Sequence, residues 1–159
     1  MQIHASNDFA ASADAVFAML TDRVFLRANA LATEPLQHEV TVDGLTTLTR
    51  RVMPSPSAVA RFTGPTLAII DEIRWDPASG PVRTGTATIT VEGMPAGLSG
   101  TVRLSPGGRG TVLDYEGELN VGVPIIGPSL AKQAAPVLLE ALSTQQQVGD
   151  AYLAKGSTE

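Results

Sequence analysis

The feature that most constrains the fold is a series of strand-like segments in residues 35–121. In the first segment, Leu36, His38, Val40 and Val42 alternate with polar residues, which is the period of a half-buried strand. Asp43-Gly44 then supplies a tight hairpin turn, and the partner strand runs from 45 to 53. Four further strands are expected at 67–75, 82–92, 98–104 and 111–121.

Short connections rich in Gly and Pro separate the last four strands: DPASGP, GMPAG and SPGGRG. Connections of this length and composition join neighbouring antiparallel strands, so a meander is expected. The longer connection MPSPSAVARFTGP has room for one helical turn over 57–62. We expect it to form a loop at one end of the sheet.

The chain begins and ends with segments of a different kind. Residues 2–9 alternate as a strand, and Ser12 and Asp14 then mark the start of a helix, which a second short helix follows towards residue 31. A long amphipathic helix is expected after Pro128. Its sheet-facing side carries Leu130, Ala134, Val137, Leu138, Ala141, Leu142, Gln145, Val148 and Tyr152. One strand, two short helices, six strands and one long helix define an α+β architecture.

Pro136 conflicts with this last helix, because proline inside a helix removes a backbone hydrogen bond and clashes with the preceding turn. Two interpretations remain open. The helix is kinked at Pro136 and follows a curved sheet, or Pro136 is the first residue of the true helix and 128–134 form a separate turn.

The length of 159 residues suits one domain, which we place at 1–155, with 156–159 as a flexible tail. The N-terminus lacks the basic and apolar regions of a secretory signal, so a cytoplasmic location is expected. No apolar run approaches ~18 residues, which argues against stable insertion in a membrane. A net charge of −5 without a basic cluster argues against nucleic acid; the pair Arg50-Arg51 is interpreted as strand residues.

Named catalytic and cofactor motifs are missing. The chain has no cysteine and only His4 and His38, without metal-ligand spacing, so no metal centre is expected. The segment GLSG at 97–100 is not a serine-hydrolase motif, and PGGRG at 106–110 lacks the ending of a phosphate-binding loop. We therefore expect no cofactor.

Three segments carry a family resemblance: FAASADAVFAMLTDRVFL, DEIRW and GVPIIGPSLAKQAAPVLLEALSTQQQVGDAYL. With the order of elements, they resemble the START-like, pollen-allergen-like (SRPBCC) superfamily, and within it an actinobacterial family of uncharacterised proteins. The resemblance implies a helix-grip fold, in which a curved, seven-stranded antiparallel sheet wraps around the long C-terminal helix. It also implies a cavity between sheet and helix.

In such a fold, one parity of each strand points inward. The expected ligand-binding residues are His38, Val40, Ile69, Asp71, Ile73, Trp75, Ala87, Ile89, Val102, Tyr115, Leu119, Leu138 and Leu142. The inward positions also include small residues at Gly85, Ala87, Gly100 and Gly117. These small residues either leave volume for an apolar pocket or serve helix packing and sheet bending.

His38, Asp71 and Tyr115 interrupt the apolar inward positions. One interpretation is that each side chain is exposed to solvent or hydrogen-bonded and has no function in binding. The other is that the three converge and anchor a polar head group. Our leading hypothesis is a protein that binds a small hydrophobic molecule such as a lipid, an isoprenoid or a polyketide. The alternatives are a cyclase- or dehydratase-like enzyme that uses His38 and Asp71 as acid and base, and a partner-binding domain without an open cavity.

Overall fold

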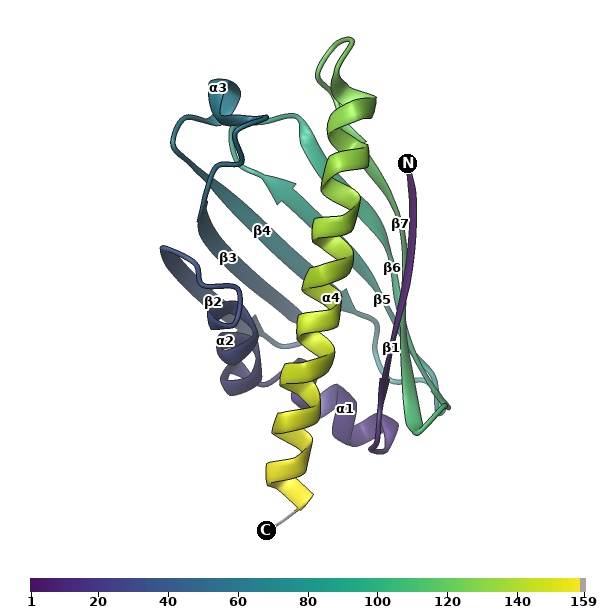
Figure 1. The fold of residues 1–159 in the computed structure, drawn as a ribbon. Coiled ribbons are helices and arrows are strands. Elements are labelled where there is room, and N and C mark those ends of the chain that lie inside the picture. The colour runs from purple at the N-terminus through teal and green to yellow at the C-terminus, as the bar shows by residue number, and fades with distance from the viewer. Residues whose placement is uncertain (158–159) are drawn as a thin grey trace.

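The computed structural model describes residues 1–157. Seven antiparallel strands form one sheet in the order β1-β7-β6-β5-β4-β3-β2, and the long helix α4 lies along the concave face of that sheet (Figure 1). The strands are β1 (Gln2–Phe9), β2 (Gln37–Asp43), β3 (Thr46–Pro54), β4 (Thr66–Trp75), β5 (Arg83–Val91), β6 (Ala96–Gly107) and β7 (Gly110–Val121). The helices are α1 (Ala13–Leu20), α2 (Arg23–Leu31), α3 (Ala60–Thr63) and α4 (Gly127–Ser157).

The expected order of elements and the helix-grip architecture are confirmed. Ser12 caps α1 by accepting a hydrogen bond from the Ala15 N–H, and Asp22 caps α2 by accepting one from the Val24 N–H, so each short helix begins at its own N-cap. The expected tail at 156–159 overlaps α4, which runs to Ser157, and residues 158–159 lie outside the described part of the chain.

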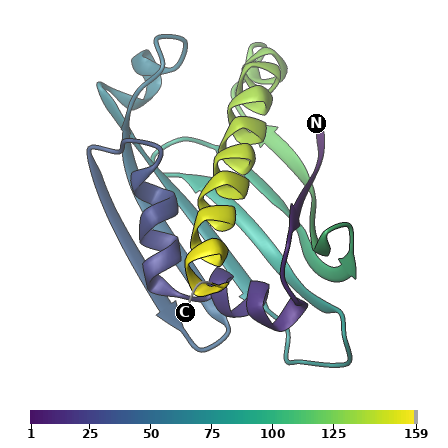
Figure 2. The same cartoon turned by 60° about the horizontal axis from the view of Figure 1, so that its bottom comes forward.

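Figure 2 shows that α1, α2 and α4 all lie on the same face of the sheet. On that face, residues in register across neighbouring strands form rows. One row runs across six strands and consists of Thr47, Ile73, Ala87, Gly100, Gly117 and Ile3. The next consists of Thr49, Asp71, Ile89, Leu98 and Leu119. The inward parity expected from the sequence matches these rows.

The glycines of the inward positions serve the bending of the sheet. A Cβ at Gly100 would lie 1.9 Å from the Glu116 carbonyl oxygen and 2.5 Å from the Gly117 Cα. A Cβ at Gly85 would lie 2.6 Å from the Arg74 carbonyl oxygen. Because these atoms belong to neighbouring strands, the missing side chains allow strand backbones to approach closely, and they do not make room for α4.

Helix α4 rests on one side of the sheet. Near its start, Ala131 and Ala135 pack on Ile3 of β1 and Leu119 of β7 in a small apolar cluster. Its last turns reach the main core, where Val148 and Tyr152 pack against a cluster that includes Phe9 and Phe25. The small residues in the first cluster bring α4 close to β1 and β7, and β3–β5 are left less covered.

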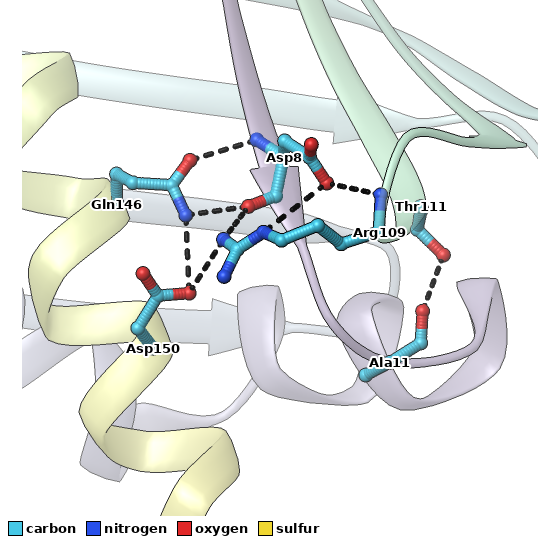
Figure 3. Close-up of polar contacts among 6 residues, drawn as sticks. All are labelled: Asp8, Ala11, Arg109, Thr111, Gln146 and Asp150. Atoms are coloured by element: carbon cyan, nitrogen blue, oxygen red, sulfur yellow. Dashed lines mark hydrogen bonds and ion pairs between the residues drawn. The ribbon is translucent and has the colours of Figure 1, made fainter.

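Polar contacts fix the C-terminal half of α4 to the end of β1 (Figure 3). The Gln146 side chain accepts a hydrogen bond from the Asp8 N–H at 2.7 Å and donates one to the Asp8 carbonyl oxygen at 2.6 Å. Arg109 of the β6–β7 turn also donates to that carbonyl oxygen and forms an ion pair with Asp150 at 3.2 Å. Gln146 therefore satisfies the backbone of an edge strand as well as positioning the helix.

Pro136 lies inside α4, because the helix begins at Gly127. The interpretation that Pro136 starts a separate helix is wrong. Proline cannot donate to the Lys132 carbonyl, which is its normal partner four residues earlier. Both Pro136 and Lys132 are exposed, so water can hydrate the freed carbonyl and lower the cost of the missing bond.

Replacing Pro136 with Ala should restore this backbone hydrogen bond on the exposed side of α4. We expect the P136A variant to gain about 1–3 kcal/mol in free energy of unfolding, since proline is disfavoured by that order inside helices. Chemical denaturation measured by circular dichroism checks the gain. A loss of stability would mean that the local bend is required for packing.

Gly149 allows the Phe9 ring to contact the backbone of α4. Glycine-to-alanine changes stabilise most helices, but a Cβ here would lie 2.5 Å from Phe9 Cε1 and 3.2 Å from Met19 Cε, and both side chains are fully buried. We expect G149A to lose about 1–3 kcal/mol in free energy of unfolding. The exposed Ser143 of the same helix supplies the control, because S143A should be neutral or slightly stabilising.

Candidate functional site

A cavity lies between β3–β7 and the first half of α4. Its larger part measures about 590 Å³ and its smaller part about 160 Å³. Both parts share the same wall residues at their junction, so they are adjoining chambers of one space. The shared residues are Thr33, Arg51, Asp71, Ile89, Leu98, Leu138 and Ala141.

The larger chamber is mainly apolar and is built from the sheet, three loops and α4. Its apolar wall includes Met53, Leu67, Ile69, Ile89, Val91, Met94, Leu119, Val121, Leu130 and Leu138. The polar groups Glu34, Gln133, Glu140 and Thr144 also line it. An apolar enclosure with a few polar groups is the usual composition of a site for a small organic molecule.

An ion pair lies at the junction of the two chambers. Arg51 of β3 and Asp71 of β4 are diagonal neighbours on the concave face, since Arg51 is opposite Ile69 in the strand register. Arg51 Nη2 lies 3.1 Å from Asp71 Oδ2, and Arg51 Nη1 donates to the Thr33 hydroxyl at 3.2 Å. Thr33 follows α2, so the guanidinium of β3 is held by one partner on β4 and one at the end of α2.

One donor of this guanidinium has no protein acceptor. Arg51 Nε is buried and makes no hydrogen bond within the described part of the chain. The exposed fractions of the two side chains, 14% for Arg51 and 33% for Asp71, include surface in the cavity wall. Burial raises the pKa of Asp71 above its ordinary value, and the charge and hydrogen bond of Arg51 oppose this rise. The junction therefore combines a fixed cation and a carboxylate, whereas the unpaired Nε is covered by protein atoms and does not face the cavity.

A second polar group lies at the end of the smaller chamber. The Tyr115 hydroxyl is within 3.2 Å of Gln145 Oε1, which also accepts a hydrogen bond from Asn7 at 2.9 Å. Burial raises the pKa of Tyr115 to about 12, so the phenol is neutral at physiological pH. It can donate or accept a hydrogen bond there without a change in charge.

Nine of the thirteen residues expected to bind a ligand line the cavity, and their contact with a ligand stays a prediction. They are Ile69, Asp71, Ile73, Ala87, Ile89, Tyr115, Leu119, Leu138 and Leu142. The other four do not line it. Trp75 and Val102 lie in the main core, where the Phe17 ring packs edge-on against Trp75 at 5.4 Å.

The expectation that His38 and Val40 line the cavity is wrong. Both have the expected inward parity, because His38 is opposite Arg51 and Val40 is opposite Thr49. However, β2 is the edge strand of the sheet, and the cavity ends at Arg51 and Thr33. His38 is consequently exposed to solvent and cannot meet Asp71 inside the cavity.

Arg51, Thr33 and Gln145 are site residues that the sequence pattern does not predict. In β3 the cavity-facing positions are Thr47, Thr49, Arg51 and Met53, whereas Leu48, Arg50 and Val52 have the other parity. Because both faces of this strand carry polar and apolar residues, the usual alternation rule does not show which parity points inward. Gln145 does occupy the expected sheet-facing side of the long helix, but an amide there gives no signal in sequence.

Two negative findings apply to the described residues 1–157. No group of three or more histidine, cysteine, aspartate or glutamate side chains is arranged to hold a metal ion. None of the helices in this part of the chain is long and apolar enough to cross a membrane.

This arrangement of sheet and helix defines the helix-grip fold class, and solved structures share it. The protein TTHA0849 from Thermus thermophilus is 18% identical, with a TM-score of 0.67 and coverage of 99% of both chains. A STAR-related lipid transfer protein from Xanthomonas axonopodis is 13% identical, with a TM-score of 0.62 and coverage of 96% and 85%. Zhui aromatase/cyclase from a Streptomyces species is 16% identical, with a TM-score of 0.59 and coverage of 96% and 92%.

Within that class, the chain belongs to the family DUF2505, described as "Protein of unknown function", whose profile matches residues 4–153. A search of curated proteins finds no match. The actinobacterial origin implied by the sequence resemblance stays a prediction.

The ion pair at the junction yields a pH-dependent prediction. In R51M, Asp71 loses the partner that lowers its pKa, so keeping its partly buried carboxylate ionised costs more free energy in the folded protein. We expect a loss of about 1–3 kcal/mol in free energy of unfolding near pH 8, below the usual cost of breaking a buried pair because Asp71 is one-third exposed. The loss should shrink as pH falls, because Asp71 takes up a proton in the folded protein at a higher pH than in the unfolded chain.

Arg50 provides a matched control for this measurement. Its guanidinium makes two hydrogen bonds to the Glu92 carboxylate, at 2.9 and 3.0 Å, on the exposed side of the sheet. We expect R50M to cost less than about 1 kcal/mol, as surface ion pairs do. Equal losses for the two variants, or a loss in R51M that does not change between pH 5 and pH 8, would contradict the assignment.

Proposed function

We propose that this protein binds one small, mostly apolar molecule in the cavity between the sheet and α4. The observation that carries the proposal is the apolar chamber of about 590 Å³, whose wall includes the charged side chain of Arg51. This volume lies within the range of sites for small organic ligands. The lipid transfer protein and the aromatase/cyclase with the same fold support a ligand of lipid or polyketide type.

The polar groups suggest how such a ligand is oriented. An oxygen atom of the ligand can accept a hydrogen bond from the guanidinium of Arg51 at the junction, while the apolar body fills the larger chamber. A short polar extension can reach Tyr115 in the smaller chamber.

Neither alternative function gains a specific observation in its favour. The proposed acid–base pair of His38 and Asp71 is separated, because His38 lies outside the cavity. A partner-binding domain would be favoured by a filled interior, whereas the space here is lined by apolar side chains. Binding is therefore preferred over catalysis, and a cytoplasmic location remains part of the proposal.

Filling the cavity tests this function directly. Leu138 lines both chambers, so L138W should occupy the junction and remove ligand binding. We expect native mass spectrometry of protein purified from its own host to show a bound small molecule in the wild type and none in L138W. The fluorescence of anilinonaphthalene sulfonate added to ligand-free protein should fall in the same variant.

The neighbouring residue Leu139 supplies the control, because it lies on the outer side of α4 and is 46% exposed. L139W adds the same indole to the same helix and should leave binding unchanged. Retention of the molecule and of dye binding by a folded L138W protein would refute the proposed site, and a wild type that carries no molecule and binds no dye would refute the function.

A further inference from the structure

Three connections lie at the same end of the sheet: β3–β4 with α3 (55–65), β5–β6 (92–95) and β7–α4 (122–126) (Figure 1). The last two are joined by a hydrogen bond from the Gly122 N–H to the Pro95 carbonyl oxygen at 2.6 Å. We call these three connections the upper loops. The first two border the end of the larger chamber, since Pro56, Val59 and Met94 belong to its wall.

The upper loops contain almost no charge. Although 17% of the chain is charged, their only ionisable side chains are Arg61 and Glu92. Arg61 lies over the Phe62 ring, 4.8 Å from its centre, and Glu92 is paired with Arg50. The connections at the opposite end carry Asp22, Asp76 and Arg109, and the α2–β2 connection, which borders the chamber beside the upper loops, carries Glu34.

The same loops expose large apolar side chains. Ile125 is 98% exposed and Phe62 is 41% exposed. Ile125 also has a φ of +70°, in the left-handed region that a β-branched residue rarely adopts. Asparagine or glycine would suit this backbone better and would cost nothing in packing, because Ile125 packs against almost nothing. Its apolar side chain therefore gains nothing within the isolated protein.

We propose that the upper loops dock reversibly onto a neutral, zwitterionic lipid surface, with Ile125 and Phe62 entering its interfacial layer. Apolar side chains gain free energy there, whereas charged groups would have to lose water. A net charge of −5 and the lack of a basic cluster make an anionic surface unsuitable. Docking is superficial, in keeping with the lack of a membrane-spanning helix among the described residues.

This inference goes beyond the proposed ligand binding and stands on the loops alone. Docking would also change the surroundings of the cavity. The end of the chamber that the docked loops border would face an apolar phase rather than water. An apolar molecule can then pass between the two phases without crossing bulk solvent.

Flotation with vesicles of pure phosphatidylcholine tests the docking. We expect the wild type to float with the vesicles and I125N to lose about tenfold in partition coefficient, the loss expected for one large apolar side chain. Asn tolerates the left-handed backbone, so I125N should keep or slightly raise the thermal midpoint, which separates lost docking from lost folding. F62S should show a smaller loss, because Phe62 is less exposed.

Val24 of α2 supplies the control, because it is 66% exposed but lies outside the upper loops. V24N should float like the wild type. Three results would overturn the inference: no flotation of the wild type, equal flotation of I125N and V24N, or flotation that requires phosphatidylglycerol and disappears in high salt. Dye binding of I125N in solution should stay unchanged, so this test fails independently of the cavity.

Discussion

The position of α4 on the sheet is the constraint on which the rest of the structure depends. Ala131 and Ala135 let the first half of the helix approach β1 and β7, and Gly149 lets the second half approach Phe9. Gln146 then fixes the helix to the backbone of β1. Because these contacts between α4 and the sheet lie on the β1 side, the helix does not press against the concave face over β3–β5, and the cavity is the space that results.

The architecture follows from sequence because it depends on periodicity. Alternation in residues 35–121 predicts the strands, and parity correctly directs Ile69, Asp71 and Ile89 towards the helix. Parity does not show how far a strand lies from the centre of the sheet. His38 and Asp71 have the same orientation, but β2 lies at the edge and β4 near the centre, so only Asp71 meets the cavity. Arg51 escapes prediction for another reason: β3 carries polar and apolar residues on both faces, so its sequence does not show which parity points inward.

A buried ion pair is a poor source of stability, since the cost of removing two charges from water offsets much of their attraction. Hydrophobic residues at Arg51 and Asp71 would fill the junction and close the passage between the two chambers. The pair keeps this junction polar, and the hydrogen bond to Thr33 restricts the orientation of the guanidinium. We interpret the arrangement as one that gives up stability for an oriented donor, as a site for a single polar atom requires.

The distribution of prolines also distinguishes the two ends of the domain. Pro54, Pro56, Pro65, Pro95 and Pro124 lie in or next to the upper loops, where they restrict backbones that have few side-chain contacts. Pro136 acts on the helix above the larger chamber, whereas the half of α4 held by Gln146 and Asp150 contains no proline among its described residues. Backbone stiffness in the loops and a missing helix bond beside the cavity therefore occur at the end where a ligand would enter. The opposite end holds the core around Phe9 and Phe25, which carries the stability of the domain.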